Sequence, residues 1–160
     1  MTHRAHVITV SDGVSAGTRE DLSGPALRNL LQNADFEVSE PEVVPDKNER
    51  ITDAIVAAVV AGADLVVTTG GTGLGPRDVT PQATSMLIDY EVPGISELMR
   101  RSGATSTPMA VLSRGLAGVR GHALILNVPG SMKGATESLE AVLPVLGHAM
   151  QLLHGHTRHE

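Results

Sequence analysis

The sequence predicts a three-layer α/β fold, with a mostly parallel sheet and helices on both faces. Apolar runs rich in β-branched residues alternate with segments whose apolar residues recur at helical spacing. Strands and helices that alternate in this way pair in parallel through right-handed crossovers. The chain has one Phe and one Tyr, so aliphatic side chains must fill the core, and 160 residues is the size of one ordinary domain. We therefore expect a single domain over residues 1–160, with a disordered tail from about residue 154.

The first half of the chain contains two predicted strand and helix pairs. The run HVITVSD, residues 6–12, predicts a buried strand, and Ser23 is expected to cap the helix that follows. Residues 36–46 predict a second strand, in which Pro41 suits only an edge position because it cannot donate a ladder hydrogen bond. A helix over residues 48–62 follows, with apolar side chains at helical spacing.

The second half repeats this pattern and ends in a long helical segment. Thr80 and Pro81 predict an N-cap and a first helical position. Pro144 is expected to kink or interrupt the last helix. The expected elements are a strand over 63–69, helices over 82–90 and 95–101, strands over 109–115 and 122–131, and a helix from about Lys133.

Charge and composition exclude several classes of function. With 12 Lys and Arg against 18 Asp and Glu, the net charge is −6, so no basic stripe is available for sequence-independent nucleic-acid binding. The absence of Cys excludes disulfides, thiolate metal sites and a thiol nucleophile. The N-terminus has no apolar segment of signal-peptide length, and Asp64 interrupts the run IVAAVVAGADLVV short of a membrane span. We expect a cytoplasmic protein without membrane or nucleic-acid partners.

The run VVTTGGTGLGPRDVTPQA, residues 66–83, joins a strand to a helix through four glycines and an Arg-Asp pair. A Walker phosphate loop needs Lys and then Ser or Thr after the last glycine, but Pro76 and Arg77 follow it here. Pro76 also occupies the third glycine position of the dinucleotide-binding fingerprint. The loop therefore matches neither of these phosphate-binding motifs.

The glycines of this loop leave its backbone accessible to a ligand. Gly70, Gly71 and Gly73 permit close approach, and their N–H groups can form an anion-binding nest. A tight strand-to-helix connection, in which the glycines only provide positive φ, explains the loop equally well when it is considered alone. The loop by itself leaves a ligand site and a structural turn open.

Other unusual loops are expected to lie near this one. Ligands of α/β folds bind beyond the carboxyl ends of the strands, and each of these loops follows a predicted strand. We therefore expect them to converge on one rim of the sheet. They are Ser11–Gly13, Pro45–Asp46, Gly70–Asp78, Ser113–Gly115 and Asn127–Ser131.

Motifs along the whole chain carry a family resemblance. They are TTGGTG followed by PRDVTPQA, with VSDG, DLSG and VVPD before them and LSRGLAGVRG and LILNVPGSMKG after them. In this order, from about Val7 to Leu153, the chain resembles the molybdopterin adenylyltransferases of molybdenum cofactor biosynthesis, the MogA/MoaB group, including the G domain of gephyrin. The resemblance implies transfer of AMP from Mg-ATP to the terminal phosphate of molybdopterin, with release of pyrophosphate. It also implies a homotrimer and a molybdenum-insertion protein as a partner.

The resemblance identifies Asp46 and Asp78 as catalytic residues, because they match the family's aspartates in VVPD and GPRD. A phosphate monoester is mostly dianionic at neutral pH, so the attacking group needs no strong base. The site must hold two anions and neutralise charge at the transferred group, which Mg²⁺ on one or two carboxylates can do. Asp46 and Asp78 are therefore also the expected Mg²⁺ ligands. Taken singly, Asp78 could stabilise a helix dipole and Asp46 could close a turn.

Further residues of the rim loops are expected to bind the pterin or the nucleotide. They are Asp12, Gly70, Gly71, Thr72, Gly73, Arg77, Ser113, Pro129, Gly130 and Ser131. Helix capping is the alternative role for Ser23 and Ser131, and a solvated surface position is the alternative for Arg77 and Lys133. A binding or scaffolding member of the family without catalysis is the alternative function. A regulatory nucleotide-binding domain would explain the glycine loop alone, but not the other motifs.

Four of the seven histidines lie near the C-terminus, in a segment that ends HGHTRHE. A metal site would need ligands held on rigid elements, and terminal segments are usually mobile. We therefore expect a solvated tail rather than a metal site. The histidines are His148, His154, His156 and His159.

Overall fold

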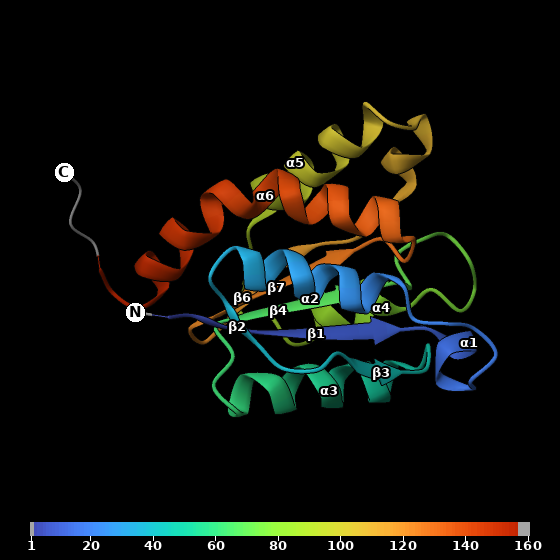
Figure 1. Cartoon of the computed structure of the whole chain (residues 1–160), viewed down its shortest axis with the longest axis horizontal. Coiled ribbons are helices and arrows are strands. Elements are labelled where there is room, and N and C mark those ends of the chain that lie inside the picture. The colour runs from blue at the N-terminus through green and yellow to red at the C-terminus, as the bar shows by residue number, and fades with distance from the viewer. Residues whose placement is uncertain (1, 157–160) are drawn as a thin grey trace.

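Seven strands form one mixed sheet in the computed structural model, which describes residues 2–156 (Figure 1). The order across the sheet is β2-β1-β4-β7-β6-β5, and β3 pairs with β1 beyond the end of β2. The pairs that β1 forms with β2, β3 and β4 are parallel, as is β4 with β7, whereas β5, β6 and β7 pair antiparallel. The strands are β1 (Arg4–Val10), β2 (Glu37–Val38), β3 (Glu42–Val44), β4 (Leu65–Thr69), β5 (Tyr90–Glu91), β6 (Ala117–Arg120) and β7 (Ala123–Val128).

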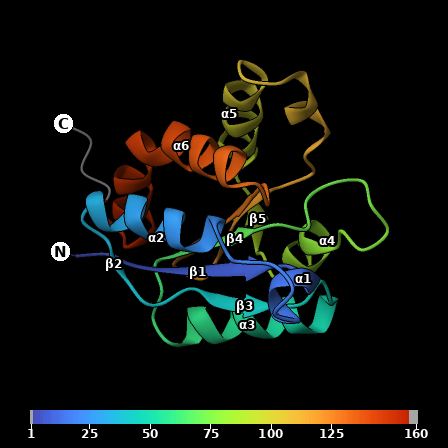
Figure 2. The same cartoon turned by 45° about the vertical axis from the view of Figure 1, so that its right-hand side comes forward.

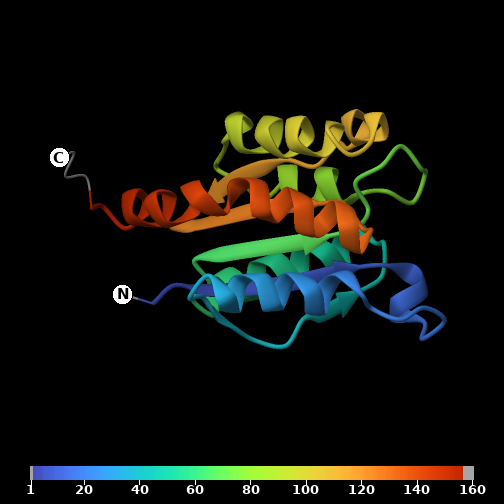
Figure 3. The same cartoon turned by 45° about the horizontal axis from the view of Figure 1, so that its top comes forward.

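Helices cover both faces of the sheet, which confirms the predicted fold class. One face packs against α2, α5 and α6, which lie side by side in Figure 3, and the other face packs against α3 and α4. Figure 2 shows the sheet between these two layers. The helices are α1 (Asp12–Ser15), α2 (Ser23–Asn33), α3 (Asn48–Val60), α4 (Thr80–Ser85), α5 (Pro93–Ala104), the 3-10 helix η1 (Pro108–Leu112) and α6 (Met132–Leu153).

The centre of the sheet is aliphatic, as the composition predicts. In the parallel register, Val7 of β1 lies opposite Val67 of β4, and Val67 lies opposite Leu126 of β7. All three side chains are fully buried. Because the strands bury both faces, their sequences are nearly continuous apolar runs rather than alternating ones.

The strand predicted over residues 109–115 is wrong. Pro108 begins η1 instead, and the hydroxyl of Thr107 accepts a hydrogen bond from the Met109 N–H at 3.3 Å. The strand lies later, at Ala117–Arg120, and a tight turn at Gly121, with φ 60°, joins it to β7. The last two strands therefore form an antiparallel hairpin and not a crossover.

Two predicted helix caps are also wrong. Ser23 is the first residue of α2, and the Asp21 carboxylate accepts the hydrogen bond from the Gly24 N–H at 3.0 Å. Thr80 is the first residue of α4, and its hydroxyl donates to the carbonyl of Gly70 at 2.9 Å. Thr80 thus holds the glycine loop rather than capping its helix.

The two prolines that were expected to disturb elements behave differently. The single strand predicted over residues 36–46 is wrong, because Pro41 divides it into β2 and β3, but both lie at the edge of the sheet, the only position predicted to suit Pro41. Pro144 does not interrupt α6, which runs through it for 22 residues. None of the helices within residues 2–156 has both the length and the apolar character that a membrane span needs.

The solvated tail expected at the C-terminus is wrong for its first residue. His154 follows α6 as its C-cap, and its Nε2 lies 2.7 Å from Oδ1 of Asp64. His148 and His156 are exposed. The remaining part of the expected tail, residues 157–160 with His159, lies outside the described residues.

Candidate functional site

The predicted rim loops meet at one edge of the sheet. Hydrogen bonds between Asp12 and Asp46 connect the ends of β1 and β3. The backbone N–H of Arg114 donates to Thr72 O at 2.8 Å, which connects the loop before β6 to the glycine loop. Gly70, after β4, lies against Gly130, after β7. Ser113–Gly115 reaches this edge in a way the sequence did not indicate, because it precedes β6 and that strand runs antiparallel to β7.

The first two glycines of the loop are required by the fold. Gly70 and Gly71 have φ of 103° and 68°, which side-chain-bearing residues rarely adopt. A Cβ on Gly70 would overlap the carbonyl oxygen of Val10, and one on Gly71 would overlap the hydroxyl of Thr80. The structural explanation of the loop is therefore correct for these two positions, whatever they also do for a ligand.

The outer glycines serve the Asp78 carboxylate instead. A Cβ on Gly73 or on Gly75 would lie 2.9 Å from Oδ2 of Asp78. The Gly75 N–H donates to that oxygen at 2.9 Å, and the Asp78 N–H donates to Gly75 O at 3.0 Å. The carboxylate of Asp78 thus lies against bare backbone on the inner side of a turn.

Arg114 holds the outer part of the loop, a role that the sequence analysis missed. Its Nε donates to Gly73 O and its Nη2 donates to Asp78 O, both at 2.8 Å. The planar guanidinium suits such a two-point contact, whereas an ammonium group does not. The available signal was a basic residue within a predicted rim loop, in the run LSRG.

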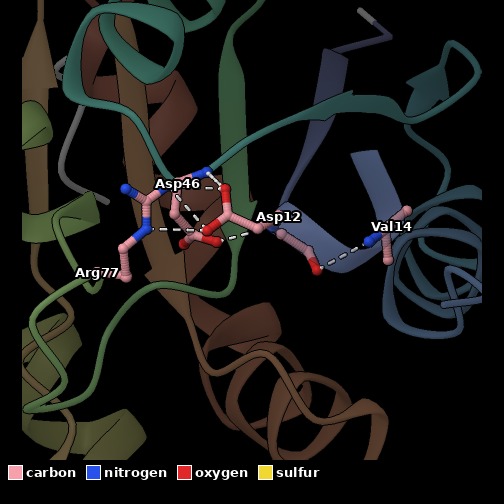
Figure 4. Close-up of polar contacts among 5 residues, drawn as sticks. Asp12, Val14, Asp46 and Arg77 are labelled. Atoms are coloured by element: carbon pink, nitrogen blue, oxygen red, sulfur yellow. Dashed lines mark hydrogen bonds and ion pairs between the residues drawn. The ribbon is translucent and has the colours of Figure 1, made fainter. Parts of the chain in front are cut away.

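Asp12 and Asp46 bind each other's backbone at the ends of neighbouring strands (Figure 4). The Asp12 N–H donates to Asp46 Oδ2 at 2.8 Å, and the Asp46 N–H donates to Asp12 Oδ1 at 3.0 Å. Arg77 reaches Asp12 with two nitrogens, Nε and Nη2, each at 3.0 Å from a carboxylate oxygen. This arrangement fixes Asp46 beside the glycine loop and engages Arg77 with a carboxylate.

The two aspartates of this pair have pKa values shifted in opposite directions. Desolvation raises the pKa of Asp46, and the negative charges of Asp12 and Asp78 add to that effect. The pKa of Asp12 is lowered, because hydrogen bonds from Arg77 and from the Asp46 backbone outweigh its desolvation. Asp46 is therefore the carboxylate that would gain most from a nearby cation.

Two clefts open on either side of the glycine loop. The first, of about 500 Å³, is polar, and we call it the acidic cleft. The second, of about 290 Å³, lies between the loop, α5 and η1, and we call it the apolar cleft. Of the predicted site residues, the acidic cleft contains Asp46, Gly70, Gly71, Asp78, Gly130 and Ser131. The apolar cleft contains Thr72, Gly73, Ser113, Pro129 and Ser131.

Comparison with known proteins decides the family. A family model described as a probable molybdopterin binding domain matches residues 6–148. The chain belongs to this family. The resemblance expected from the motifs is thereby confirmed.

Relatives of this chain are similar over nearly all of it. It is 40% identical over 152 residues to a molybdopterin adenylyltransferase of Helicobacter pylori, an alignment that covers 93% of this chain and 86% of the relative. It is 40% identical over 151 residues to a molybdenum cofactor biosynthesis bifunctional protein of Synechococcus elongatus, covering 94% of this chain but 47% of that protein. The chain thus spans about half the length of such bifunctional relatives.

A solved structure agrees with the fold. The molybdopterin biosynthesis enzyme MoaB from Thermus thermophilus is 54% identical and superposes with a TM-score of 0.90, covering 96% of this chain and 98% of the other. The mixed sheet with its two helical layers is therefore the architecture of this family.

Some predicted site residues of the domain lie outside both clefts. Among the residues described, neither cleft is lined by Asp12, Arg77 or Lys133. Arg77 is paired with Asp12, so it does not point a free cation at either cleft. Ser131 lines both clefts, and its hydroxyl also accepts the Gly134 N–H at 3.1 Å as the cap of α6. The cap and a ligand contact are compatible roles for Ser131, since a hydroxyl can accept and donate at once.

The acidic cleft of the domain has donors that suit Mg²⁺. Asp46 and Asp78 each have one oxygen, Oδ1, that accepts no hydrogen bond from another described residue. Mg²⁺ binds through one or two carboxylates and completes its shell with water and substrate phosphates. The carboxylates lining this cleft outnumber its basic side chains: they are Glu20, Asp21, Asp46 and Asp78, against Arg19. A polyphosphate would be repelled here without a cation, so the residues fit the expected metal.

Proposed function

We propose that this domain is a molybdopterin adenylyltransferase that uses Mg-ATP. The observation that carries the proposal is the acidic cleft, where two matched aspartates, Asp46 and Asp78, face a loop of bare backbone. Relatives that bear this name align with most of the chain, which supports the same activity here. The reaction forms a bond between a phosphate oxygen of molybdopterin and the α-phosphorus of ATP. The bond from that phosphorus to the β-bridging oxygen breaks, and pyrophosphate leaves with the electron pair.

In this proposal the chain contributes positioning and charge. Mg²⁺, held by Asp46 and Asp78, would neutralise charge on the phosphates of ATP. Gly70 and Gly71 let the backbone approach the phosphates, and Ser131 and Met132, at the start of α6, line the same cleft. Arg114 keeps Asp78 in register with the loop through the two carbonyls it binds. Because these groups are fixed before the substrates bind, they need little reorganisation during the reaction.

The proposal includes three finer expectations. The enzyme acts in the cytoplasm, because the reaction consumes ATP. It forms a homotrimer, for which the exposed apolar side chains of η1, Met109 at 63% and Val111 at 64%, are candidate contacts. A molybdenum-insertion protein receives the adenylylated product. Light scattering on the purified chain tests the trimer directly.

The test of the function is pyrophosphate release from the full chain with Mg-ATP and molybdopterin. We expect one pyrophosphate per adenylylated molybdopterin, no release without molybdopterin, and loss of release with EDTA. Tight molybdopterin binding without any pyrophosphate would contradict the proposal and support the binding or scaffolding alternative.

A further inference from the structure

Three residues with metal-binding side chains meet at the edge of the sheet opposite the candidate site. His3 precedes β1, Asp64 lies in the turn before β4, and His154 follows α6. In Figure 1 the N-terminus and the end of α6 lie together at one end of the sheet, whereas α1 and the exit of β1 lie at the other. Within residues 2–156, His3, Asp64 and His154 are the one group of three whose ligand atoms all lie within 4.8 Å of one another.

The carboxylate of Asp64 is fixed by the backbone around it. The Arg4 N–H donates to Asp64 Oδ2 at 2.8 Å, and the Asp64 N–H donates back to Arg4 O at 2.8 Å. The Leu124 N–H donates to Asp64 O at 2.9 Å. The side chain therefore has one oxygen anchored to β1 and presents the other, Oδ1, to His154.

The two imidazoles approach this carboxylate from different segments. His154 Nε2 lies 2.7 Å from Asp64 Oδ1, and His3 Nδ1 lies 3.7 Å from Asp64 Oδ2. The rings of His3 and His154 are nearly parallel, with centroids 6.0 Å apart and an interplanar angle of 18°. His122 stacks on His154 at 5.8 Å, and its Nδ1 donates to Leu153 O at 2.8 Å, which steadies the end of α6.

One nitrogen of this group lacks a partner. His3 Nδ1 is buried and forms no hydrogen bond with any described residue. The 3.7 Å to Asp64 Oδ2 is too long for a hydrogen bond. Buried polar atoms are nearly always satisfied, so an unpaired imidazole nitrogen beside a carboxylate and a second imidazole points to a missing ligand.

We propose that His3, Asp64 and His154 bind a zinc ion. Two imidazoles and a carboxylate are typical zinc ligands, with bonds of about 2.0–2.2 Å, and a tetrahedral arrangement places the ligand atoms about 3.4 Å apart. The ligand atoms of the three residues lie within 4.8 Å of one another, so changes of up to about 1.4 Å in their separations suffice. Water or another ligand fills the fourth position.

The zinc ion would join three segments that are distant in sequence. It would connect the residue before β1, the turn before β4 and the end of α6. The hydrogen bond from Arg4 to Asp64 Oδ2 would orient the carboxylate from outside the ligand shell, as such contacts do in known zinc sites. The expected role is structural, because the site lies at the edge opposite Asp46 and Asp78.

Zinc titration of the full chain by calorimetry tests the site. We expect one tight site in the wild type, and an affinity at least about 10–100-fold weaker in each of His3→Ala, Asp64→Asn and His154→Ala. Co²⁺ in place of Zn²⁺ should give the visible absorption of a tetrahedral ion in the wild type and lose it in the three variants. Thermal unfolding should shift upward with Zn²⁺ in the wild type alone.

Other histidines provide the controls. His148→Ala removes an exposed imidazole of α6, and His156→Ala with His159→Ala removes those of the C-terminal run. These variants should bind zinc as the wild type does. Absence of a tight site in the wild type, or a site lost only with His156 and His159, would overturn the proposal. Circular dichroism in EDTA shows whether each ligand variant is folded. In a folded variant, a loss of zinc binding is due to the missing ligand and not to a folding defect.

Discussion

The two clefts beside the glycine loop are built from opposite kinds of side chain. The acidic cleft presents Asp46 and Asp78 next to bare backbone. The apolar cleft presents Met99, Met109 and Leu112 from α5 and η1. Ser131 lines both clefts, and the glycine loop lies between them. The loop therefore separates a surface suited to charged ligand groups from a surface suited to planar or apolar ligand groups.

The difference indicates which residues should affect turnover and which should affect stability. Asp46 has unfavourable neighbours, as its raised pKa indicates, so its negative charge does not stabilise the fold. The inner glycines, in contrast, are needed for the backbone to follow its path. Substitutions of Asp46 and Asp78 should therefore change turnover, and substitutions of Gly70 and Gly71 should change stability.

The largest effect is expected for Asp78→Asn. Asn retains an acceptor for the Gly75 N–H but loses the charge that would hold Mg²⁺. Removing one preorganised electrostatic contact lowers turnover by about 10²–10³-fold, so pyrophosphate release should fall by that factor while molybdopterin affinity is retained. Asp53→Asn, at an exposed aspartate of α3, is the matched control. Near-normal turnover with a lowered melting temperature would mean that Asp78 only supports its turn.

Asp46→Asn should lower turnover by about 10²-fold, because it removes one of the two carboxylate charges in the cleft that would hold Mg²⁺. This substitution is not expected to lower the free energy of unfolding. Because the folded pKa of Asp46 is raised, the ionised carboxylate destabilises the fold above that pKa, and the penalty disappears as pH falls below the unfolded pKa. At neutral pH the variant should be at least as stable as the wild type, and the difference should shrink in acid. Urea unfolding at several pH values measures this, and a less stable variant at neutral pH would contradict it.

Substitutions of two glycines in the loop should affect stability and turnover differently. Gly71→Ala should destabilise the protein by about 1–3 kcal/mol, because its φ is positive and the new Cβ meets Thr80. Gly73→Ala meets only the movable Asp78 carboxylate, so it should leave the melting temperature nearly unchanged and lower turnover. Equal melting temperatures for the two variants would show that the inner loop is not strained.

The smallest effect is expected for Arg77→Met. The Arg77 and Asp12 side chains are 61% and 44% exposed, so their ion pair is weak and screened by salt. Because the folded pKa of Asp12 is lowered, the pair stabilises the fold above the unfolded pKa and ceases to do so as pH falls through the folded pKa. The small loss in Arg77→Met should therefore vanish in acid. A loss that persists in acid, relative to Arg50→Met on α3, would point to packing instead.

Apart from Ser113–Gly115, the rim was predictable from the sequence, because one rule about parallel strands sufficed. Asp46 and Asp78 follow strands, and strands that run in parallel end at the same edge. The engagement of Arg77 with Asp12 was not predictable, since the two residues are separated by 65 positions. Their contact depends on how the loops fold over the rim.

Other features escaped the sequence analysis for local reasons. The apolar run MAVL suggested a strand, but Pro108 favours a turn and no neighbouring strand is available at that place. The hairpin of β6 and β7 was missed because the earlier strand was placed at residues 109–115, whereas it lies at Ala117–Arg120, next to the turn at Gly121. His154 looked like a tail residue, because its partner Asp64 is 90 positions away.

The most direct test of the central claim follows the phosphate of ATP that is transferred. ATP labelled at the α-phosphorus is mixed with the full chain, Mg²⁺ and molybdopterin, and the label is located by chromatography. We predict that the label moves to the pterin product in step with pyrophosphate release, and that Asp78→Asn slows both equally while Asp53→Asn slows neither. Label that stays with ATP, or that appears only in ADP or free AMP, would contradict adenylyl transfer in the acidic cleft.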